Sequence, residues 1–558
     1  MPQRISLGAQ DFEYIRSNHC FYVDKTCFIK EWWENRDVVT LITRPRRFGK
    51  TLNMCMLEQF FSVQYKGRTD LFEGLDIWKE EPYRDIQGTW PVIFLSFAGI
   101  KGEDYQTARG GIIQKILDLY GEYRFLQESD VLNVQERAYF DYVKPDMADE
   151  VAALALQRLA ICMNRYYGRK TLIFLDEYDT PLQEAYLNGY WKEMTGFIRG
   201  LFNNTFKTNR YMERGVLTGI TRVSKESVFS DLNNLSVVTT TSEKYASCFG
   251  FTEQEVFDAL DRYGLSEQKK NVKEWYDGFV FGSRRDIYNP WSITSFLSEK
   301  ELSAYWANTS FNALAGKLIQ TGPPSIKIAM EDLLAGKTIQ TQIDEKIIFQ
   351  QLDNNVTAIW SLFLASGYLK VEKRILEQGV KTYFLSWTNF EVKLMFRKMI
   401  DGWFKEIPGR YNEFITALLT GDVVYMNEYM NDITRKTFSS FDVGKKPSEK
   451  AEPERFYHGF VLGLIVDASL EYRITSNRES GLGRYDVVME PLKPGNPAFV
   501  LEFKVRKPTE KNLEETVANA LAQIKEKNYD AELTARGIPK EQIRHYGFAF
   551  EGEKVLIG

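Results

Sequence analysis

The chain has few of the residues that usually build metal centres and disulfide frameworks. Its 558 residues include three histidines and five cysteines. The five cysteines all lie in the first half of the chain and form no C-x-x-C pair. Cysteines spaced in this way argue against a zinc site and against a disulfide framework, and they suit a reducing cytosol. The histidines offer no Ser-His or metal-His constellation, so chemistry that depends on one is excluded.

Long apolar runs are also missing. No stretch reaches the ~18 uninterrupted apolar residues that a membrane helix needs, and the best candidate, residues 460–470, contains Asp467. The start of the chain lacks the apolar core of a signal peptide. We therefore expect a cytoplasmic protein with no membrane partner.

Charge of one sign does not dominate. The 71 Lys and Arg residues stand against 76 Asp and Glu residues, for a net charge of −5. Any contact with DNA must therefore come from a local basic surface. The hydrophobic content of 44% and the charged content of 26% are those of an ordinary soluble globular protein. At roughly 100–200 residues per domain, the length predicts three or four domains.

The clearest motif that is present is TRPRRFGKT at residues 43–51. It follows an apolar run and precedes a segment of helical spacing, which is the context of a P-loop. Backbone N–H groups of such a loop hold phosphates, Lys50 reaches the terminal ones, and Thr51 offers a hydroxyl to Mg²⁺. Arg44 stands where the usual pattern has its first glycine. We expect the nucleotide to contact Arg44, Arg46, Arg47, Phe48, Gly49, Lys50 and Thr51.

A second motif, LIFLDE at residues 172–177, places two carboxylates at the end of an apolar strand, as in a Walker B motif. Asp176 is expected to hold the Mg²⁺ hydration shell, and Glu177 to orient and deprotonate the attacking water. The alternative is a strand that ends in an acidic turn, helped by Asp179 and Pro181. The order of the two motifs, with Lys50 upstream, favours the nucleotide interpretation.

A third strand, predicted at residues 215–220, runs into Thr221 and Arg222. A polar residue that leaves a strand beside Walker B is placed to sense the γ-phosphate, and we assign this role to Thr221. Arg222, or one of the loop arginines, would neutralise transition-state charge as an arginine finger does. Two alternatives stay open: a solvated Arg222 at a strand end, and a basic loop that binds nucleic acid.

Five short apolar runs alternate with longer helical stretches in this half of the chain. This alternation favours an α/β fold with a parallel sheet covered by helices. The predicted strands are residues 38–43, 92–97, 171–175, 215–220 and 237–240.

In combination, these motifs resemble the AAA-ATPase-like family, which is widespread in gut bacteria and usually carries a C-terminal PD-(D/E)XK nuclease domain. The matching segments are YVDKT (22–26), RPRRFGKT (44–51), LDEYDTP (175–181), LTGITRVSKESVFSDLNNL (217–235), FGFTEQEV (249–256), WYDGF (275–279), YNPWSI (288–293) and YWANTS (305–310). The resemblance implies an ATPase domain over residues 1–250, a helical lid over 251–315, and ATP with Mg²⁺ as cofactors. It also implies that residues 22–25 border the nucleotide base, unless they form a packed entry strand.

The middle of the chain, residues 316–445, has mostly helical spacing and no catalytic constellation. A helix at 358–365, strands at 367–371 and 382–387, and a helix at 389–403 resemble a winged-helix arrangement. Such a module either contacts DNA or serves as a packing platform. Residues 439–453 are polar and contain lysines, which indicates a linker.

A different pattern begins at Glu454, which opens a helix. Strands are predicted at 472–476, 485–490 and 498–505, then a helix at 513–527 and a strand at 545–550. Alternation along the third strand places Glu502 and Lys504 on one face, and Asp486 begins the strand before it. This order resembles the PD-(D/E)XK nuclease core, a restriction-endonuclease-like α/β domain, over residues 446–558. By the same resemblance, Glu454 is the helix carboxylate, and Gln523, or less well Tyr529, is the later polar position.

The chemistry of this set is consistent. Asp486 and Glu502, with Glu454, are expected to hold Mg²⁺, and Lys504 to position the nucleophile or the scissile phosphate. A local cluster of Lys504, Arg506, Lys507 and Lys511 would bind nucleic-acid phosphates, or it is a solvated strand end.

Three functional hypotheses follow. The preferred one is an ATP-hydrolysing protein fused to a Mg²⁺-dependent DNA endonuclease, with RNA left open as substrate and with a setting in mobile-element or defence biology taken from the family analogy. The second is a nucleotide-dependent switch or scaffold whose nuclease-like domain binds nucleic acid or protein without cutting. The third is an interaction protein that does not hydrolyse nucleotide.

Overall fold

The computed structural model describes residues 2–558 except 223–227, 230–231, 307–311, 322–323, 335, 345–351, 353–354, 406–410, 439–460, 462–464, 466–471, 477–478, 481–482, 485, 494 and 552–553. Its elements form two compact units, one of Met1–Leu318 with Gly336–Met395 and one of Ile319–Ala335 with Phe396–Gly558. The predicted linker at 439–453 and Glu454 lie outside the described residues.

The first unit is built on a five-stranded sheet in the order β2-β3-β4-β1-β5, and every neighbouring pair is parallel. This confirms the predicted parallel sheet. The carboxyl ends of parallel strands meet at one edge, so Thr43, Asp176 and Gly219 come together there. The strands are β1 Val39–Thr43, β2 Val92–Ser96, β3 Thr171–Asp176, β4 Met212–Gly219 and β5 Leu235–Val238.

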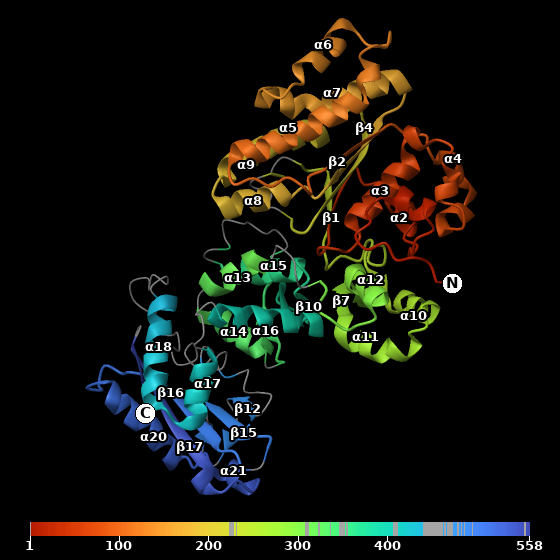
Figure 1. Ribbon diagram of the computed structural model, residues 1–558. Helices are drawn as coiled ribbons and strands as arrows, with labels where there is room; N and C mark the ends of the chain where they lie inside the picture. Colours follow the sequence, from red (N-terminus) through yellow and green to blue (C-terminus); the bar gives the residue numbers. More distant parts are fainter. Residues whose placement is uncertain are drawn as a thin grey trace. The chain divides into compact units, whose positions relative to one another are not determined.

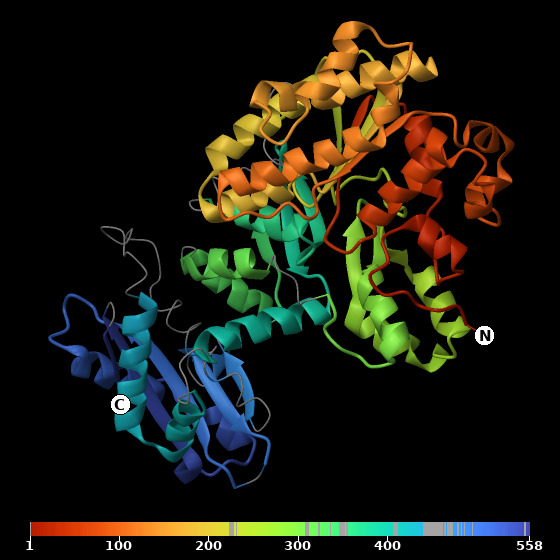
Figure 2. The same ribbon diagram turned by 45° about the horizontal axis from the view of Figure 1, so that its top comes forward.

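Helices cover both faces of this sheet. The helices of this region are α1 Phe12–Ser17, α2 Cys27–Asn35, α3 Lys50–Phe61, α4 Glu81–Ile86, α5 Tyr105–Glu122, α6 Val134–Tyr142, α7 Asp149–Tyr167, α8 Thr180–Asn188 and α9 Trp191–Phe202. Figures 1 and 2 show α2, α3 and α4 on one face and α5, α7 and α9 on the other. The central strands are buried throughout because both faces are covered.

The predicted helical lid contains a small sheet as well as helices. Its helices are α10 Glu253–Arg262, α11 Lys269–Tyr276 and α12 Pro290–Glu299, and its strands are β6 Phe251–Thr252, β7 Asp277–Phe281 and β8 Arg284–Tyr288, in the order β6-β8-β7. Gly278 in β7 has φ +134°, and a Cβ there would lie 1.9 Å from the carbonyl oxygen of Thr388. Only glycine allows this close approach.

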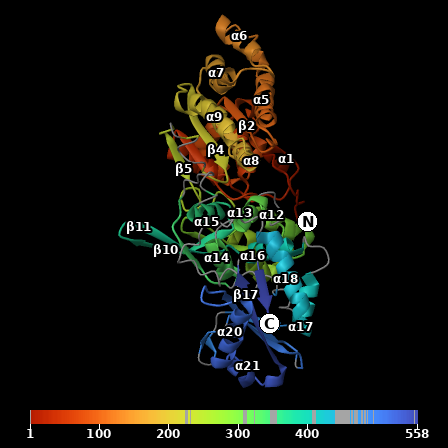
Figure 3. The same cartoon turned by 90° about the vertical axis from the view of Figure 1, so that its left-hand side faces the viewer.

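The middle of the chain has the element order helix, helix, strand, helix, strand, strand, then a long helix. The bounds are α13 Asn312–Thr321, α14 Pro324–Leu334, β9 Ile339–Thr341, α15 Val356–Ala365, β10 Leu369–Glu377, β11 Val380–Trp387 and α16 Phe390–Lys405. The β10–β11 hairpin extends outward in Figure 3. In α15 every residue from Ala358 to Leu364 is buried, so this helix has no open face for a DNA groove and serves as a packing element.

The second unit contains a mixed sheet in the order β12-β15-β16-β17-β18. Only β16 and β17 are parallel; the other neighbours are antiparallel. This agrees with the predicted nuclease-like α/β fold, to which the structure adds β18. The elements are α17 Tyr411–Thr420, α18 Val423–Phe438, β12 Tyr472–Ser476, β13 Glu479–Ser480, β14 Gly483–Arg484, β15 Val487–Pro491, β16 Ala498–Val505, α20 Leu513–Glu526, α21 Ala531–Ala535, β17 Ile543–Glu551 and β18 Lys554–Ile557.

Alternation along β16 separates its two faces. Leu501 and Phe503 join a hydrophobic core with Phe414 of α17 and Met430 of α18. Val500 faces the opposite way, in a second core with Ile524 of α20. Because Glu502 and Lys504 share the face of Val500, the sequence pattern directs both toward α20.

Two asparagines of α18 form hydrogen bonds with the backbone groups on the outer edge of β18. Asn427 donates to the carbonyl of Ile557 and accepts from its N–H, both at 2.8 Å. One helical turn later, Asn431 does the same with Val555, at 2.7 and 3.0 Å. Since α17 and α18 share the core of this sheet, we propose that the C-terminal domain begins before Tyr411 rather than at residue 446.

We predict that Asn427→Ala locally destabilises β18. The substitution leaves two backbone groups of Ile557 without their side-chain partner, at a cost of about 1–3 kcal/mol. Amide exchange of the peptide 551–558, followed by mass spectrometry, should become about tenfold faster or more, as 1.4 kcal/mol is a factor of ten. The exposed neighbour Glu428→Ala is the control and should leave exchange unchanged; equal exchange in both variants would contradict the assignment.

Candidate functional site

A strand, a tight loop and a helix form the centre of the first unit's site. β1 ends at Thr43, and α3 begins at Lys50 after Gly49, whose φ of +77° is left-handed. Lys50 is 4% exposed, and its Nζ donates to the carbonyls of Arg44 at 3.1 Å and Pro45 at 2.9 Å. Burial lowers the pKa of Lys50, and the carboxylates of Glu177 and Asp176 oppose that shift.

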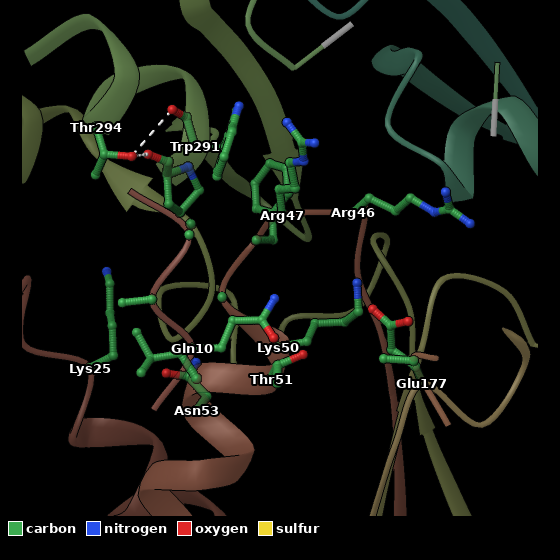
Figure 4. A pocket seen from close by; sticks show the side chains of 18 of the residues that line it. Gln10, Lys25, Arg46, Arg47, Lys50, Thr51, Asn53, Glu177, Trp291 and Thr294 are labelled. Atoms are coloured by element: carbon green, nitrogen blue, oxygen red, sulfur yellow. Dashed lines mark hydrogen bonds between the residues drawn. The ribbon is translucent and has the colours of Figure 1, made fainter. Parts of the chain in front are cut away.

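This loop forms one wall of a cavity of about 530 Å³ (Figure 4). Its lining includes loop and α3 residues from Arg46 to Asn53, Glu177, Gln183, Trp291, and residues of the N-terminal segment such as Gln10, Tyr22, Val23 and Lys25. In Figure 4, Lys50 and Glu177 point into the same part of the cavity. Three residues of the YVDKT segment, Tyr22, Val23 and Lys25, thus line this cavity, and their contact with a nucleotide base stays a prediction.

The end of β3 is joined to the loop by a direct contact. Thr51 donates its hydroxyl to Asp176 Oδ2 at 2.8 Å, and Thr218 of β4 donates to Oδ1 at 2.5 Å. Asp176 is fully buried, and burial raises its pKa against the opposing effect of these hydrogen bonds. Glu177, in a left-handed conformation with φ +51°, accepts from Thr180 at 3.2 Å.

Two of the predicted arginines line the cavity and two do not. Arg46 and Arg47 belong to its wall. Arg44 is instead fully buried beneath the loop, where it donates to the carbonyls of Thr43, Thr239 and Lys244 and lies 4.6 Å above the ring of Phe281. Burial lowers the pKa of Arg44 to about 10. The expectation that its side chain joins the phosphate cradle is therefore corrected: it supports the loop from behind.

The predictions for the end of β4 also need correction. Arg222 lines a different, small cavity with Thr43, Thr239 and Asp344. Thr221 is buried, and both its N–H and its hydroxyl donate to Asp179, at 2.9 and 3.0 Å. Thr218, which lies three residues earlier and within β4, is the residue that contacts Asp176. The register of β4 beside β3 decides which threonine meets Asp176, and the apolar pattern of the sequence does not reveal that register.

Asp179 is a residue whose part in the site sequence reasoning missed. Its carboxylate is 1% exposed and also accepts from the N–H of Ile220 and from Gln183 Nε2. Gln183 in turn accepts from Arg46 at 3.3 Å. Gly219 makes room for this network, because a Cβ there would lie 2.7 Å from Asp179 Oδ1. The LDEYDTP motif, which contains Asp179, was the available signal, although it suggested only an acidic turn.

In the second unit, the predicted carboxylates and lysine lie together on one face of the sheet. Asp486 Oδ2 accepts from the N–H of Phe503 at 2.8 Å. Glu502 is 3% exposed, with its Oε1 at 3.9 Å from Lys504 Nζ. Gln523 of α20 connects them: its Nε2 donates to Glu502, and its Oε1 accepts from Lys504 at 2.7 Å. Tyr529 adds its hydroxyl, which accepts from Gln523 at 3.2 Å.

Comparison with known families decides what these two sites belong to. Residues 6–229 match the family described as predicted AAA-ATPase, and residues 452–558 match the PD-(D/E)XK nuclease superfamily. The chain therefore contains an AAA-ATPase-like region and a C-terminal PD-(D/E)XK nuclease superfamily region. The phosphate loop and the Asp486, Glu502 and Lys504 cluster each fall within the matching region.

The likeness to one curated protein runs through both of these regions. An uncharacterized protein in the vnfD 5′ region of Azotobacter chroococcum mcd 1 is 24% identical over 551 residues, which cover 96% of this chain and 95% of that protein. Among the described residues, no helix combines the length and apolar character needed to cross a bilayer.

Segments that follow the AAA-ATPase-like region in the chain form hydrogen bonds with the loop between β1 and α3. Trp306 Nε1 and Asn289 Nδ2 both donate to the carbonyl of Arg46, at 3.0 and 3.3 Å. Trp306 also donates its backbone N–H to Glu391, which is fully buried at the start of α16. Burial raises the pKa of Glu391 to about 7, against hydrogen bonds from Trp306 and Ser292 and the charge of Arg47.

We predict that the titration of Glu391 makes the stability of the protein depend on pH. Its pKa in the folded state lies above the ordinary value, so folding binds a proton between about pH 4.5 and 7. Its contribution to stability is therefore greatest at low pH and is lost as pH rises through 7. Relative to the always neutral Glu391→Gln, the wild type should lose up to ~1.4 kcal/mol per pH unit over this window.

Thermal unfolding at pH 5.5 and pH 8 measures this difference. The exposed Glu377→Gln is the matched control and should track the wild type at both pH values. A difference between wild type and Glu391→Gln that is the same at both pH values would contradict the raised pKa.

Proposed function

We propose that this protein binds and hydrolyses ATP in the P-loop cavity and that its C-terminal domain is a Mg²⁺-dependent nuclease that acts on DNA. The observation that carries the first part is the 2.8 Å contact between Thr51 Oγ1 and Asp176 Oδ2. It joins the two motif ends that a P-loop NTPase uses for its metal, at the wall of a cavity that also holds Lys50 and Glu177.

The residues around this contact have the chemical groups that phosphoryl transfer requires. The Thr51 hydroxyl and the Asp176 carboxylate are the oxygen ligands that Mg²⁺ prefers, and the ion, when bound, would neutralise charge on the β- and γ-phosphates. Lys50 is positioned to exchange its contacts with loop carbonyls for phosphate oxygens. Glu177 enters the cavity from the other side, where its carboxylate would orient the attacking water and accept its proton.

Arg46 is the arginine best placed to neutralise transition-state charge. Arg44 is buried behind the loop, and Arg222 lines another cavity. Arg47 lies in the wall but stacks on Trp291 at 4.1 Å and donates to the carbonyl of Tyr305 at 3.5 Å. Arg46 lines the cavity and donates to Gln183, whose contact with Asp179 continues to Thr221. We assign Thr221 a positioning role through this chain, in place of direct phosphate sensing.

The nuclease proposal depends on the cluster around Gln523. Asp486 and Glu502 offer carboxylate oxygens, which fit a hard divalent cation, and such an ion would activate water and stabilise charge on phosphorus. Gln523 holds Glu502 and Lys504 in place through its two amide atoms. Lys504 would then orient the scissile phosphate by its ammonium group. DNA is the expected substrate, and RNA is tested beside it.

One observation favours the non-cutting switch as the second candidate. Arg506, which belongs to the local basic cluster, is ion-paired with Glu551 and donates to the carbonyl of Glu510. This pairing reduces the positive charge available to phosphates next to Lys504, and phosphate contacts dominate the affinity for nucleic acid. The two candidates make opposite predictions about cleavage.

We predict that Arg46→Ala separates turnover from binding. The Kd for ATP should change little, whereas kcat for hydrolysis should fall by ~10³-fold or more, the range that arginine fingers contribute. Lys50→Ala should not bind ATP, whereas Glu177→Gln should bind ATP but not hydrolyse it. The exposed Arg124→Ala is the control. Unchanged kcat in Arg46→Ala would remove the finger assignment, and a wild type without turnover would favour an interaction protein.

We predict Mg²⁺-dependent cleavage by the wild type that Asp486→Ala and Lys504→Ala each abolish, because one removes a metal ligand and the other the phosphate-orienting cation. The assay presents double- and single-stranded DNA and RNA, with and without ATP. Lys540→Ala, which removes an exposed cation just before β17, at the end of that strand remote from Lys504, should retain cleavage. A wild type that cuts none of these substrates would favour the switch or scaffold.

A further inference from the structure

Two cysteines that are far apart in the sequence meet beside the nucleotide cavity. Cys27 opens α2, and Cys248 precedes the lid; their sulfurs lie 3.6 Å apart. Glu31 stands one helical turn after Cys27, on the same face of α2. One ligand atom from each of these three residues lies within 4.8 Å of the others. The absence of a C-x-x-C pair argued against a zinc site, but the fold supplies the second thiol from 221 residues away.

We propose that Cys27, Glu31 and Cys248 form a binding site for a thiophilic divalent cation of the Zn²⁺ type. Two sulfurs that each lie ~2.3 Å from a tetrahedral ion are separated by ~3.8 Å, so the observed spacing needs little adjustment. Two thiolates and a carboxylate are a ligand set that zinc accepts, and water completes the fourth position. Mg²⁺ prefers oxygen ligands, so this site and the Thr51–Asp176 site select different metals.

The segment that carries Cys248 is held in place before any ion binds. Asn53 of α3 donates to the carbonyl of Cys248 at 2.9 Å, and Lys25 donates to the carbonyl of Ser247 at 2.9 Å. Arg44 donates to the carbonyl of Lys244 at 3.2 Å. Cys248 is fully buried, whereas Cys27 and Glu31 are partly exposed, so an ion would enter from their side.

The charges around the site are compatible with a cation. The neighbouring ammonium of Lys25 is paired with both oxygens of Glu255, at 2.8 and 2.7 Å. The two sulfurs of a disulfide lie ~2.05 Å apart, much closer than the 3.6 Å observed here. A disulfide would also not involve the carboxylate of Glu31, which lies in the same cluster.

An ion at this position would connect α2 to the wall of the nucleotide cavity. Cys248, Lys25 and Asn53 all line that cavity, yet the three proposed ligands include none of the residues assigned to phosphate or Mg²⁺. The site is therefore independent of whether the protein hydrolyses ATP, and its test does not depend on turnover.

Titration of the reduced, metal-free full-length protein with Co²⁺ tests the site, because cobalt bound by thiolates absorbs in the near ultraviolet. We expect one equivalent of Co²⁺ to produce this band and Zn²⁺ to displace it. Cys27→Ser and Cys248→Ser should each lose the band, and Cys162→Ser on α7 should keep it. Since even outer-shell changes cost roughly 10–100-fold in metal affinity, Glu31→Gln should weaken binding by at least ~10-fold.

Thermal unfolding supplies a second readout on the same proteins. Zn²⁺ should raise the Tm of the wild type and of Cys162→Ser, and a chelator should reverse the shift, while Cys27→Ser and Cys248→Ser should not respond. The proposal fails if the wild type gives no thiolate–cobalt band, if the band persists in both cysteine variants, or if the reduced wild type re-forms a Cys27–Cys248 disulfide in air and binds no metal.

Discussion

The buried guanidinium of Arg44 is the contact on which the nucleotide site depends. Removing a permanent cation from water is costly unless its donors are satisfied. Here the carbonyls of Thr43, Thr239 and Lys244 accept from its two terminal nitrogens, and the ring of Phe281 covers the flat face, while the buried Nε has no hydrogen-bond partner among the described residues. A usual phosphate loop gains its shape from glycine; this one is held by the carbonyls of Thr239 and Lys244, in the segment that follows the edge strand β5. Residues up to 200 positions away therefore fix the position of Lys50.

The two sites, although they serve different proposed reactions, share one construction. Each places a carboxylate on a buried stretch of a central strand, at the end of β3 for Asp176 and within β16 for Glu502, and each holds it with a polar side chain from a helix that packs on that strand. Thr51 of α3 does so for Asp176, and Gln523 of α20 does so for Glu502. Burial makes such contacts stronger and more costly to leave incomplete, which keeps the carboxylates in one orientation.

The elements that local pattern predicts are those whose burial repeats with a short period. The five parallel strands, the alternation that pairs Glu502 with Lys504, and the strand–loop–helix around Lys50 all follow from neighbours within a few residues. Contacts between distant segments did not follow. The burial of Arg44, the choice of Thr218 over Thr221, the network on Asp179 and the meeting of Cys27 with Cys248 all depend on strand register or on loops that come together only in the folded chain. The winged-helix order was visible in the sequence, but the burial of α15 on all sides was not.

The side-chain amides of Asn427 and Asn431 give the second unit a property of its own. An edge strand normally presents alternating donors and acceptors to any extended polypeptide nearby. On β18 these groups are already engaged at Val555 and Ile557, so another chain could not extend the sheet there without first displacing α18. Self-association by strand addition is therefore blocked at this edge, even though β18 is the outermost strand of the sheet.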